Sequence, residues 1–440
     1  MSATQTRRHF LTATSGAAAA SLLCPPLARA QAPVKRRRYA IVGTGSRGIG
    51  MWGRGFQARY GDELEFVGLC DVNPLRVEAA KRELEVGCRT FTSLDQMLEQ
   101  AKPDLLVVTT VDAFHAECIT KALGRGIDVL TEKPMVVDEA QCRAVIDAEK
   151  ASGGKLTVTF NYRYAPKHQK IKELLLEGAI GAVSSVDFSW YLDTSHGADY
   201  FRRWHRLRAR SGSLWVHKAS HHFDLVNWWL AADPVEVSAF AGLHHYGRNG
   251  PYRAENCRTC PRKADCRFHW DLLASPAMRR LYADCESADG YLRDGCVFRE
   301  DVDIPDTMNA VVRYSNGAAM SYSVNTFMPV EGYRIAFNGT KGRLEVRDWE
   351  RQPWSVEEET EIHIMRNFGQ REKVGIPRAE GGHGGGDNRL KDLIFKSVSM
   401  PEYMRLPDSR AGALACLTGI AARRSADEGR PVRIGDLVTV

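Results

Sequence analysis

Residues 214–229 carry two histidines and an aspartate at helical spacing. His217 and His221 are four residues apart and Asp224 follows three residues later, so on a helix both imidazoles and the carboxylate share one face. Imidazole gains and loses a proton near neutral pH, which makes this face a candidate for acid–base catalysis. The same spacing could hold a metal, but a third ligand is lacking and we predict no metal site. Buried structural histidines are the alternative.

Another histidine, His383, stands inside the run Gly381-Gly-His-Gly-Gly-Gly-Asp387. So many glycines disfavour a stable helix, and the run predicts a flexible loop. A histidine in such a loop can swing into a substrate cleft and transfer a proton there. The sequence leaves two interpretations open, a simple connection and a catalytic loop.

A glycine-rich turn near the N-terminus predicts a dinucleotide-binding site. Residues 38–42 form a short apolar strand, and residues 49–60 can continue as a helix. The turn between them reads Gly43-Thr-Gly45-Ser46-Arg47-Gly48. Its glycines permit a tight turn and let backbone N–H groups approach a pyrophosphate, while the helix start supplies the positive end of its dipole.

An acidic residue at the next strand end bears on which dinucleotide binds. Asp71 ends the predicted strand 65–70, where a carboxylate accepts hydrogen bonds from the adenosine ribose hydroxyls. Asp71 therefore favours NAD. Arg47 could instead meet a 2′-phosphate, so NADP remains an alternative.

Strands and helices alternate up to residue 161. We predict further helices over 74–85, 113–124 and 139–151, and strands over 104–110, 128–131 and 156–161. This alternation is typical of a doubly wound parallel sheet, a Rossmann domain spanning 36–161. Ligands bind such sheets at the carboxyl ends of the strands. Four polar residues stand at these ends: Thr110, Glu132, Lys133 and Asn161.

The pattern changes beyond Tyr162. Longer strands with alternating polar and apolar residues are predicted over 183–192, 235–245, 308–314 and 318–325, with a tight turn at Ser315-Asn-Gly317. They indicate an open, mainly antiparallel sheet with one helix-covered face. We therefore predict an α/β protein in which the Rossmann domain precedes a substrate-binding α+β domain over 162–440, with a cysteine-rich insertion over 250–300.

A series of motifs follows in order along nearly the whole chain after the leader. They are Thr110 through His115, Glu132-Lys133-Pro134, Asn161-Tyr-Arg163 with Pro166, Gly178-Ala-Ile-Gly181, His221-x-x-Asp224 and Gly339-Thr-Lys-Gly342. Together they resemble the glucose-fructose oxidoreductase, inositol dehydrogenase and MocA family (Gfo/Idh/MocA). The resemblance implies that Lys133 contacts both the nicotinamide side and the substrate hydroxyl, and that the peptide before Pro134 is cis. It also implies cofactor contacts from Thr110, His115, Glu132, Asn161 and Arg163.

The resemblance also assigns roles to the histidines. His221 falls on the family's substrate-contacting histidine, so Lys133 and His221 are the leading acid–base pair. His217 stands where many members carry Asp, a departure from a standard polyol dehydrogenase, and we expect it to orient or relay. The glycine-flanked His383 is similar to a histidine of NAD-dependent α-N-acetylgalactosaminidases in this superfamily.

The N-terminus is typical of an export signal. Thr-Arg-Arg-His-Phe-Leu at 6–11 precedes a weakly apolar stretch to residue 27 and the cleavage pattern Ala28-Arg-Ala30. We predict a twin-arginine signal over 1–30 and a periplasmic or secreted mature protein. No later apolar run is long enough for a membrane span. A net charge of +6 without a basic stripe argues against nucleic acid as a partner.

Ten cysteines remain after the leader, and five cluster in the insertion: Cys257, Cys260, Cys266, Cys285 and Cys296. The spacing Cys-x-x-Cys-x5-Cys is similar to a metal knuckle, whereas an exported setting favours disulfides. Disulfides, a structural zinc or iron–sulfur site, and free thiols all remain open.

Export limits the chemistry, because free NAD is scarce outside the cytoplasm. We expect NAD, or NADP, to stay tightly bound, with a small-molecule sugar or glycoside as substrate and a homo-oligomeric assembly. In one cycle a sugar is oxidised and a second carbonyl compound is reduced. In the other, transient oxidation permits elimination of a glycosidic group, water adds and the hydride returns. A sugar-binding module without catalysis is a third interpretation, but Lys133 is intact.

Overall fold

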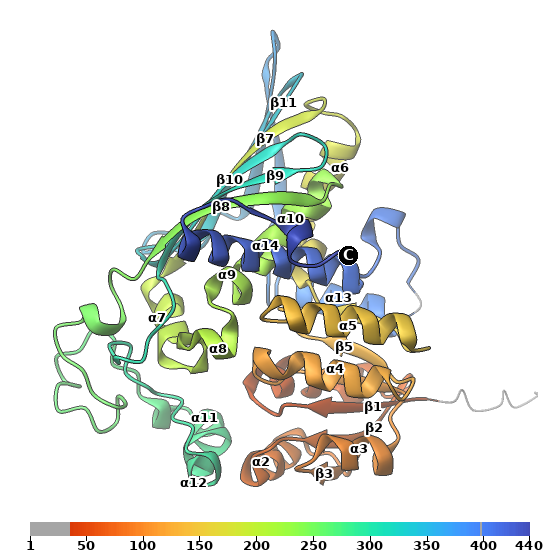
Figure 1. Ribbon diagram of the computed structural model, residues 1–440, viewed down its shortest axis with the longest axis vertical. Coiled ribbons are helices and arrows are strands. Elements are labelled where there is room, and N and C mark those ends of the chain that lie inside the picture. Colours follow the sequence, from red (N-terminus) through yellow and green to blue (C-terminus); the bar gives the residue numbers. More distant parts are fainter. Residues whose placement is uncertain (1–35, 397) are drawn as a thin grey trace, which may run out of the picture. The chain divides into compact units, whose positions relative to one another are not determined.

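The computed structural model describes residues 36–396 and 398–440 (Figure 1). The predicted twin-arginine signal, residues 1–30, lies outside the described residues. Two β-sheets organise the described chain, one from each of the two predicted domains.

The N-terminal sheet has six parallel strands in the order β3-β2-β1-β4-β5-β6. Its strands are β1 (Arg37–Val42), β2 (Leu64–Cys70), β3 (Arg89–Phe91), β4 (Leu105–Val108), β5 (Asp128–Thr131) and β6 (Leu156–Val158). The connecting helices include α2 (Pro74–Leu84), α3 (Leu94–Ala101), α4 (His115–Leu123) and α5 (Glu139–Ala151). The central strand β4 is buried throughout, as a strand covered on both faces should be. This strand order confirms the predicted Rossmann sheet.

The segment after the glycine turn differs from the single predicted helix over 49–60. A π-helical turn, η1 (Gly48–Gly53), is followed by a short helix, α1 (Phe56–Tyr60). Gly55 lies between them with φ 73°, a left-handed conformation that interrupts the helix. The sequence pattern also misses β3, which has only three residues, and α3.

The C-terminal sheet has nine strands in the order β14-β13-β12-β11-β7-β10-β9-β8-β15. These are β7 (Val183–Asp193), β8 (Pro234–Gly242), β9 (Thr307–Tyr314), β10 (Ala319–Met328), β11 (Glu331–Gly339), β12 (Gly342–Arg351), β13 (Glu359–Arg366), β14 (Arg371–Pro377) and β15 (Val432–Arg433). β10 pairs with β7 in parallel, and the remaining pairs are antiparallel. Buried and exposed residues alternate along β9, which confirms an open sheet with one covered face.

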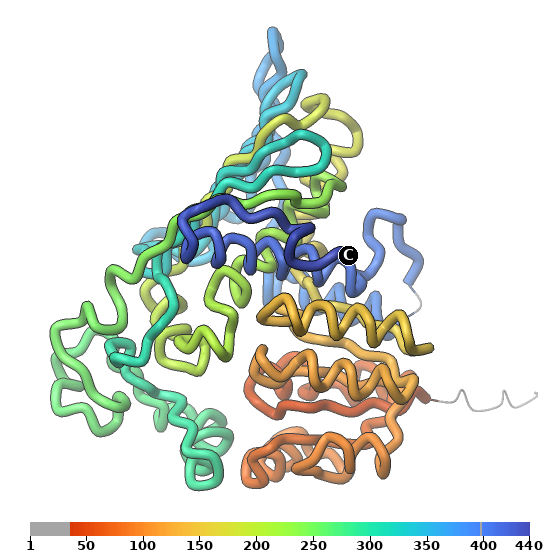
Figure 2. Tube along the Cα trace, viewed as in Figure 1, coloured from red at the N-terminus to blue at the C-terminus, as the bar shows by residue number. Residues whose placement is uncertain are grey.

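Helices cover one face of this sheet and connect it to the Rossmann domain. They include α6 (Pro166–Leu176), α7 (Thr194–Arg202), α8 (Arg208–Ser211), α9 (Leu214–His217), α10 (Ala219–Leu230), α13 (Gly386–Phe395) and α14 (Ser409–Glu428). Figure 2 shows the dark blue α14 running between green β8 and gold α5. Arg424 of α14 forms an ion pair with Glu139 of α5 at 3.2 Å. The two domains therefore share one continuous hydrophobic core.

The histidine-bearing segment is not one helix. α9 ends at His217 and α10 begins at Ala219, with Lys218 between them. The expectation that His217, His221 and Asp224 share one helical face is therefore wrong. No helix among the described residues is both long and apolar enough to cross a membrane.

The insertion over 250–300 contains short helices, among them α11 (Pro276–Leu281) and α12 (Glu286–Asp289), and no long strand within the described chain. The cysteines of residues 36–396 and 398–440 are all free thiols. The same residues hold no group of three or more His, Cys, Asp or Glu that could bind a metal. Among the described residues, the insertion cysteines therefore form neither a disulfide nor a metal-binding group. Ion pairs of Arg258 with Glu286 (2.5 Å) and Asp294 (2.9 Å) hold the insertion together instead.

Candidate active site

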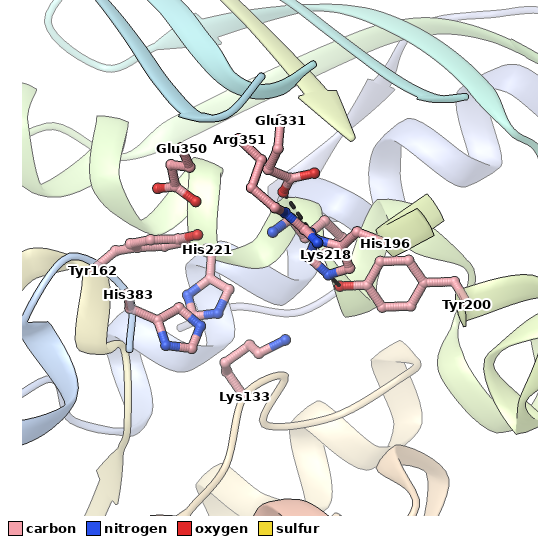
Figure 3. Close-up of a pocket in the computed structure, with 10 residues that line it drawn as sticks. All are labelled: Lys133, Tyr162, His196, Tyr200, Lys218, His221, Glu331, Glu350, Arg351 and His383. Carbon is pink, nitrogen blue, oxygen red and sulfur yellow. Dashed lines mark hydrogen bonds and ion pairs between the residues drawn. The ribbon is translucent and has the colours of Figure 1, made fainter. Parts of the chain in front are cut away.

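A pocket of about 330 Å³ opens at the carboxyl edge of the Rossmann sheet (Figure 3). Both domains line it, through Lys133, Tyr162, His196, Tyr200, Lys218, His221, Glu331, Glu350, Arg351 and His383. Lys133 follows β5, Lys218 joins α9 to α10, and Glu331 begins β11. The volume is within the range of small-molecule sites. Three of the four predicted catalytic residues, Lys133, His221 and His383, thus meet in one pocket.

Lys133 is held at the pocket by the main chain of the second domain. Its Nζ donates a hydrogen bond to the carbonyl oxygen of His217 at 3.1 Å. Burial lowers the pKa of Lys133 to about 8; the Asp112 carboxyl opposes this shift and the Lys218 charge adds to it. The Lys133-Pro134 peptide is cis, as the resemblance implies. An amine that titrates near neutral pH at a pocket can accept and return a proton.

His221 is a buried, neutral imidazole. Burial lowers its pKa well below the usual value, and the positive charge of Lys133 lowers it further. Its ring lies 4.8 Å from that of Tyr162 and 5.5 Å from that of His383, measured between centroids. Within the described chain its Nδ1 has no hydrogen-bond partner. Because the neutral ring also lines the pocket, His221 can hydrogen-bond a ligand there without carrying charge.

His383 forms an ordered pair with Asp387. Its Nδ1 lies 3.0 Å from the Asp387 Oδ1, and Asn161 Nδ2 donates to the same oxygen at 2.5 Å. Asn161 Nδ2, a donor, also lies 3.0 Å from this Nδ1. The Asp387 carboxylate, which only accepts, favours the tautomer with Nδ1–H, and in that tautomer Nε2 is a proton acceptor. Burial lowers the pKa of His383, and the Asp387 charge offsets part of this shift. The ring is thus neutral at neutral pH.

The glycine run around His383 forms a turn that leads into α13, whereas its composition predicts a loop throughout. Gly386 begins α13, and a Cβ at this position would lie 2.3 Å from the backbone oxygen of Asn161. The His383 ring packs against that of Tyr162 with centroids 4.9 Å apart. Glycine therefore permits close packing here, and His383 is already held in the pocket.

The imidazole of His217 is absent from the pocket lining. Its Nδ1 lies 2.5 Å from the Asp112 Oδ2, and both side chains are buried. Desolvation raises the pKa of Asp112 and lowers that of His217, so burial favours the neutral forms of both. His217 orients Lys133 through its carbonyl oxygen, not through its ring as expected.

The glycine turn after β1 fits a dinucleotide. Gly43 adopts φ 90°, and a Cβ there would lie 2.6 Å from the backbone of Thr109. A Cβ at Gly48 would lie 2.3 Å from the Gly43 oxygen. Only glycine can occupy either position without displacing the backbone. The turn lies at the carboxyl end of β1, where Rossmann domains bind the pyrophosphate.

Asp71 lies at the end of β2, as predicted, but protein donors already use much of its carboxylate. Thr44 donates to one oxygen from its backbone N–H (2.8 Å) and hydroxyl (3.0 Å), and the Asn73 N–H donates to the other at 2.9 Å. Ribose hydroxyls would need its remaining lone pairs. Arg47 instead pairs with Glu132 at 2.7 Å, which removes the reason to expect a 2′-phosphate contact from it.

Several residues expected at the cofactor hold the strand-end loops. Glu132 also accepts from the indole N–H of Trp52 at 2.9 Å. The ring nitrogens of His115 lie 2.7 Å from the Pro134 oxygen and 3.2 Å from the Thr110 oxygen. The side chains of Glu132 and His115 and the main-chain oxygen of Thr110 thus hold the loops on either side of Lys133, and none of these three residues lines the pocket.

Arg163 has a different partner from the one expected. Its guanidinium donates to Asp224 through Nε (2.7 Å) and Nη2 (2.5 Å), and both residues are largely buried. This bidentate pair joins the segment after β6 to α10. Arg163 therefore has a structural role in this pair, and its contact with the cofactor stays a prediction.

Sequence reasoning missed much of the far wall of the pocket, which consists of His196, Tyr200, Lys218, Glu331, Glu350 and Arg351. Glu331 and Glu350 stand at the ends of β11 and β12, and only the sheet register brings them together. Lys218 was missed as well, although the sequence offered a signal for it: this lysine lies between the two candidate histidines, His217 and His221.

Two family models match the chain. "Oxidoreductase family, NAD-binding Rossmann fold" covers residues 37–160, and "Oxidoreductase family, C-terminal alpha/beta domain" covers residues 172–434. The chain belongs to the Gfo/Idh/MocA family. The resemblance drawn from the motifs is thus confirmed, and the protein is a member of an NAD-binding oxidoreductase family.

Relatives of known name agree with this membership. The chain is 40% identical over 422 residues to the Bacillus subtilis protein named "Putative oxidoreductase YteT", covering 91% of this chain and 98% of that protein. It is 27% identical over 181 residues to an inositol 2-dehydrogenase of Rhizobium meliloti, covering 41% and 52%. A solved oxidoreductase from Thermotoga maritima has the same fold, with a TM-score of 0.64, 18% identity and coverage of 92% and 100%.

Proposed function

We propose that this Gfo/Idh/MocA protein is an oxidoreductase that transfers a hydride between a tightly bound nicotinamide dinucleotide and a sugar or polyol. One observation carries the proposal. Lys133, with a pKa of about 8, faces a pocket at the carboxyl edge of the NAD-binding domain. An amine with this pKa is suited to exchanging a proton with a hydroxyl. A binding module without catalysis gives no reason to bury a lysine here.

Each residue of the pocket has its own role in the proposed reaction. A nicotinamide dinucleotide held at the Gly43–Gly48 turn would supply the hydride acceptor for the carbon that bears the reacting hydroxyl. That hydroxyl also has to lose its proton, and the neutral amine of Lys133 accepts it. His221, neutral and lining the same pocket, holds the hydroxyl by a hydrogen bond. The His217 oxygen keeps the Lys133 amine in position.

The far wall supports a polyhydroxylated substrate. Lys218 offers N–H donors, whereas Glu331 and Glu350 offer acceptors. A hydroxyl is both donor and acceptor, so donors and acceptors side by side can fix several hydroxyls of one sugar. Glu331 is itself fixed by His196 at 2.9 Å and by the Asp193 N–H at 2.8 Å.

We propose NAD rather than NADP, because the Asp71 carboxylate would repel a 2′-phosphate and Arg47 is engaged elsewhere. The leader supports export to the periplasm or beyond. An exported enzyme depends on keeping its cofactor between turnovers, which is why tight binding belongs to the proposal.

A redox-neutral glycosidase is the second candidate, and the His383–Asp387 pair favours it. Elimination of a glycosidic group needs a base in addition to Lys133, and the neutral His383 with a free Nε2 supplies one. We place simple oxidoreduction first because Lys133 and His221 are sufficient for it.

Product analysis in deuterated water separates the two cycles. A lactone or keto-sugar, formed with stoichiometric reduction of an acceptor, supports the oxidoreductase. Free sugar at its original oxidation state, with deuterium beside the transiently oxidised carbon, supports the glycosidase. Neither product from any sugar, polyol or glycoside would overturn both.

A further inference from the structure

Part of the insertion lies against the dinucleotide edge of the Rossmann domain. The Tyr282 hydroxyl accepts the Ser46 N–H at 2.8 Å and donates to the Ser46 Oγ at 3.2 Å. Asn73 Nδ2, just beyond β2, donates to the Cys285 oxygen at 2.9 Å. In Figure 1, α11 and α12 lie beside α2. We name residues 276–291 the cap segment.

Arg76 of α2 forms a second set of contacts with the cap segment, separate from those of Tyr282 with the glycine turn. Its Nε donates to the Leu281 oxygen at 3.3 Å, and its Nη2 pairs with Asp289 at 2.8 Å. The guanidinium carbon lies 5.6 Å from the ring centroid of Tyr282 and 5.9 Å from that of Tyr291. Only 8% of Arg76 is exposed, so the guanidinium is enclosed between α2 and the cap segment, while its partner Asp289 lies at the surface.

The site of the Tyr282 contact matters, because it lies in the glycine turn. Backbone N–H groups of such turns bind the pyrophosphate of a dinucleotide. A Cβ on Gly45 would lie 3.2 Å from the Tyr282 hydroxyl, so this hydroxyl sits directly over the turn. An oxygen of the protein thus accepts the Ser46 N–H that a phosphate oxygen would accept.

We infer that the cap segment closes the dinucleotide site and that Tyr282 is a phosphate-binding residue. An entering phosphate takes over the Ser46 N–H, and the Tyr282 hydroxyl then donates its proton to that phosphate. Both bonds are charge-assisted in the bound state. Tyr282 therefore exchanges one hydrogen-bond partner for another.

Retention of the cofactor follows from the same contacts. For the dinucleotide to leave, the cap segment has to separate from the turn, which loosens the Asn73 and Arg76 contacts as well. Release is therefore slow. This inference rests on the proposed binding of a nicotinamide dinucleotide, but it concerns binding alone and is tested without catalysis.

The test is the rate at which protein loaded with NADH releases it, followed by nicotinamide fluorescence after dilution into excess NAD. We expect Tyr282→Phe to accelerate release by about 10- to 100-fold, the effect of losing one hydrogen bond to a charged group. Tyr252→Phe is the matched control, because Tyr252 belongs to the same insertion but packs on Phe298. It should release NADH at the wild-type rate.

Hydrogen exchange of the wild-type protein provides a second readout that needs no variant. Addition of NAD should slow amide exchange across residues 276–291. Equal release rates for wild type and Tyr282→Phe, or unchanged exchange in the cap segment, would overturn the cap while leaving the proposed function intact. A wild-type protein that binds neither NAD nor NADH would overturn both.

Discussion

The amine of Lys133 and the main-chain oxygen of His217 lie 3.1 Å apart, which joins the Rossmann domain to the break between α9 and α10. This contact fixes a pocket-lining amine whose pKa burial lowers to about 8. His217 therefore contributes through its backbone, whereas its imidazole belongs to a buried pair with Asp112.

The pKa of Lys133 predicts opposite pH profiles for the two directions of hydride transfer. Burial lowers that pKa to about 8, so the amine is mainly charged below pH 8 and mainly neutral above it. Oxidation of a hydroxyl needs the neutral base, and its kcat/KM should rise with pH to a plateau above about 8. Carbonyl reduction needs the charged acid and should fall over the same interval. Flat profiles in both directions would remove Lys133 from the proton transfer.

Lys218 should act on substrate binding and on Lys133. Its charge is among the causes that lower the pKa of Lys133, and it lines the far wall of the pocket. Lys218→Met should therefore raise KM for sugars by about tenfold or more and move the Lys133 pH limb upward. Lys170→Met, on the half-exposed side of α6, is the control and should change neither quantity. Steady-state kinetics across pH measures both.

The His383–Asp387 pair predicts different outcomes in the two cycles. Asp387→Asn removes the carboxylate that orients the Nδ1–H of His383 and weakens Nε2 as a base. If the protein is a glycosidase, cleavage should fall by about 10²-fold while transient reduction of the cofactor persists. If it is a simple oxidoreductase, single-turnover hydride transfer should change by less than about tenfold. Rapid-mixing absorbance with parallel product assay tests this.

The Arg163–Asp224 pair should contribute to stability and not to chemistry. Arg163→Met leaves the Asp224 carboxyl buried without its partner, and we expect a loss of about 3 to 5 kcal/mol in the free energy of unfolding. The double variant Arg163→Met with Asp224→Leu should recover much of that loss. Denaturant unfolding measures the stability. A cofactor-binding defect in folded Arg163→Met, with unchanged stability, would contradict this assignment.

Local sequence signals predicted what depends on local sequence. The parallel sheet, Gly43 and the strand-end residue Lys133 follow from periodicity and turn chemistry. The break in the helix at Lys218 and the conformation of the glycines beside His383 do not follow from local sequence, because tertiary packing decides both. Gly386, for example, is needed because the chain approaches the Asn161 backbone closely there.

Contacts between residues far apart in the sequence could not be predicted from it either. Arg163 and Asp224 are both polar residues in family motifs, and nothing local indicates that they bind one another. Glu331 and Glu350 of the far wall come together through the register between β11 and β12. The alternation of polar and apolar residues along each strand does not specify that register. The cap segment lies in an insertion whose cysteine spacing indicates metal or disulfides, not contact with the dinucleotide edge.

The most direct test of the claim that Lys133 exchanges the hydroxyl proton during hydride transfer is a single turnover of the purified protein loaded with NAD. Candidate sugars, polyols and glycosides are added one at a time, and the absorbance band of reduced nicotinamide is recorded for the wild type and for Lys133→Met. We predict that at least one compound produces the band in the wild type, and that Lys133→Met, still retaining NAD, slows its appearance by about 10²-fold or more. Equal rates in the two proteins, or no band with any of these compounds, would contradict the account.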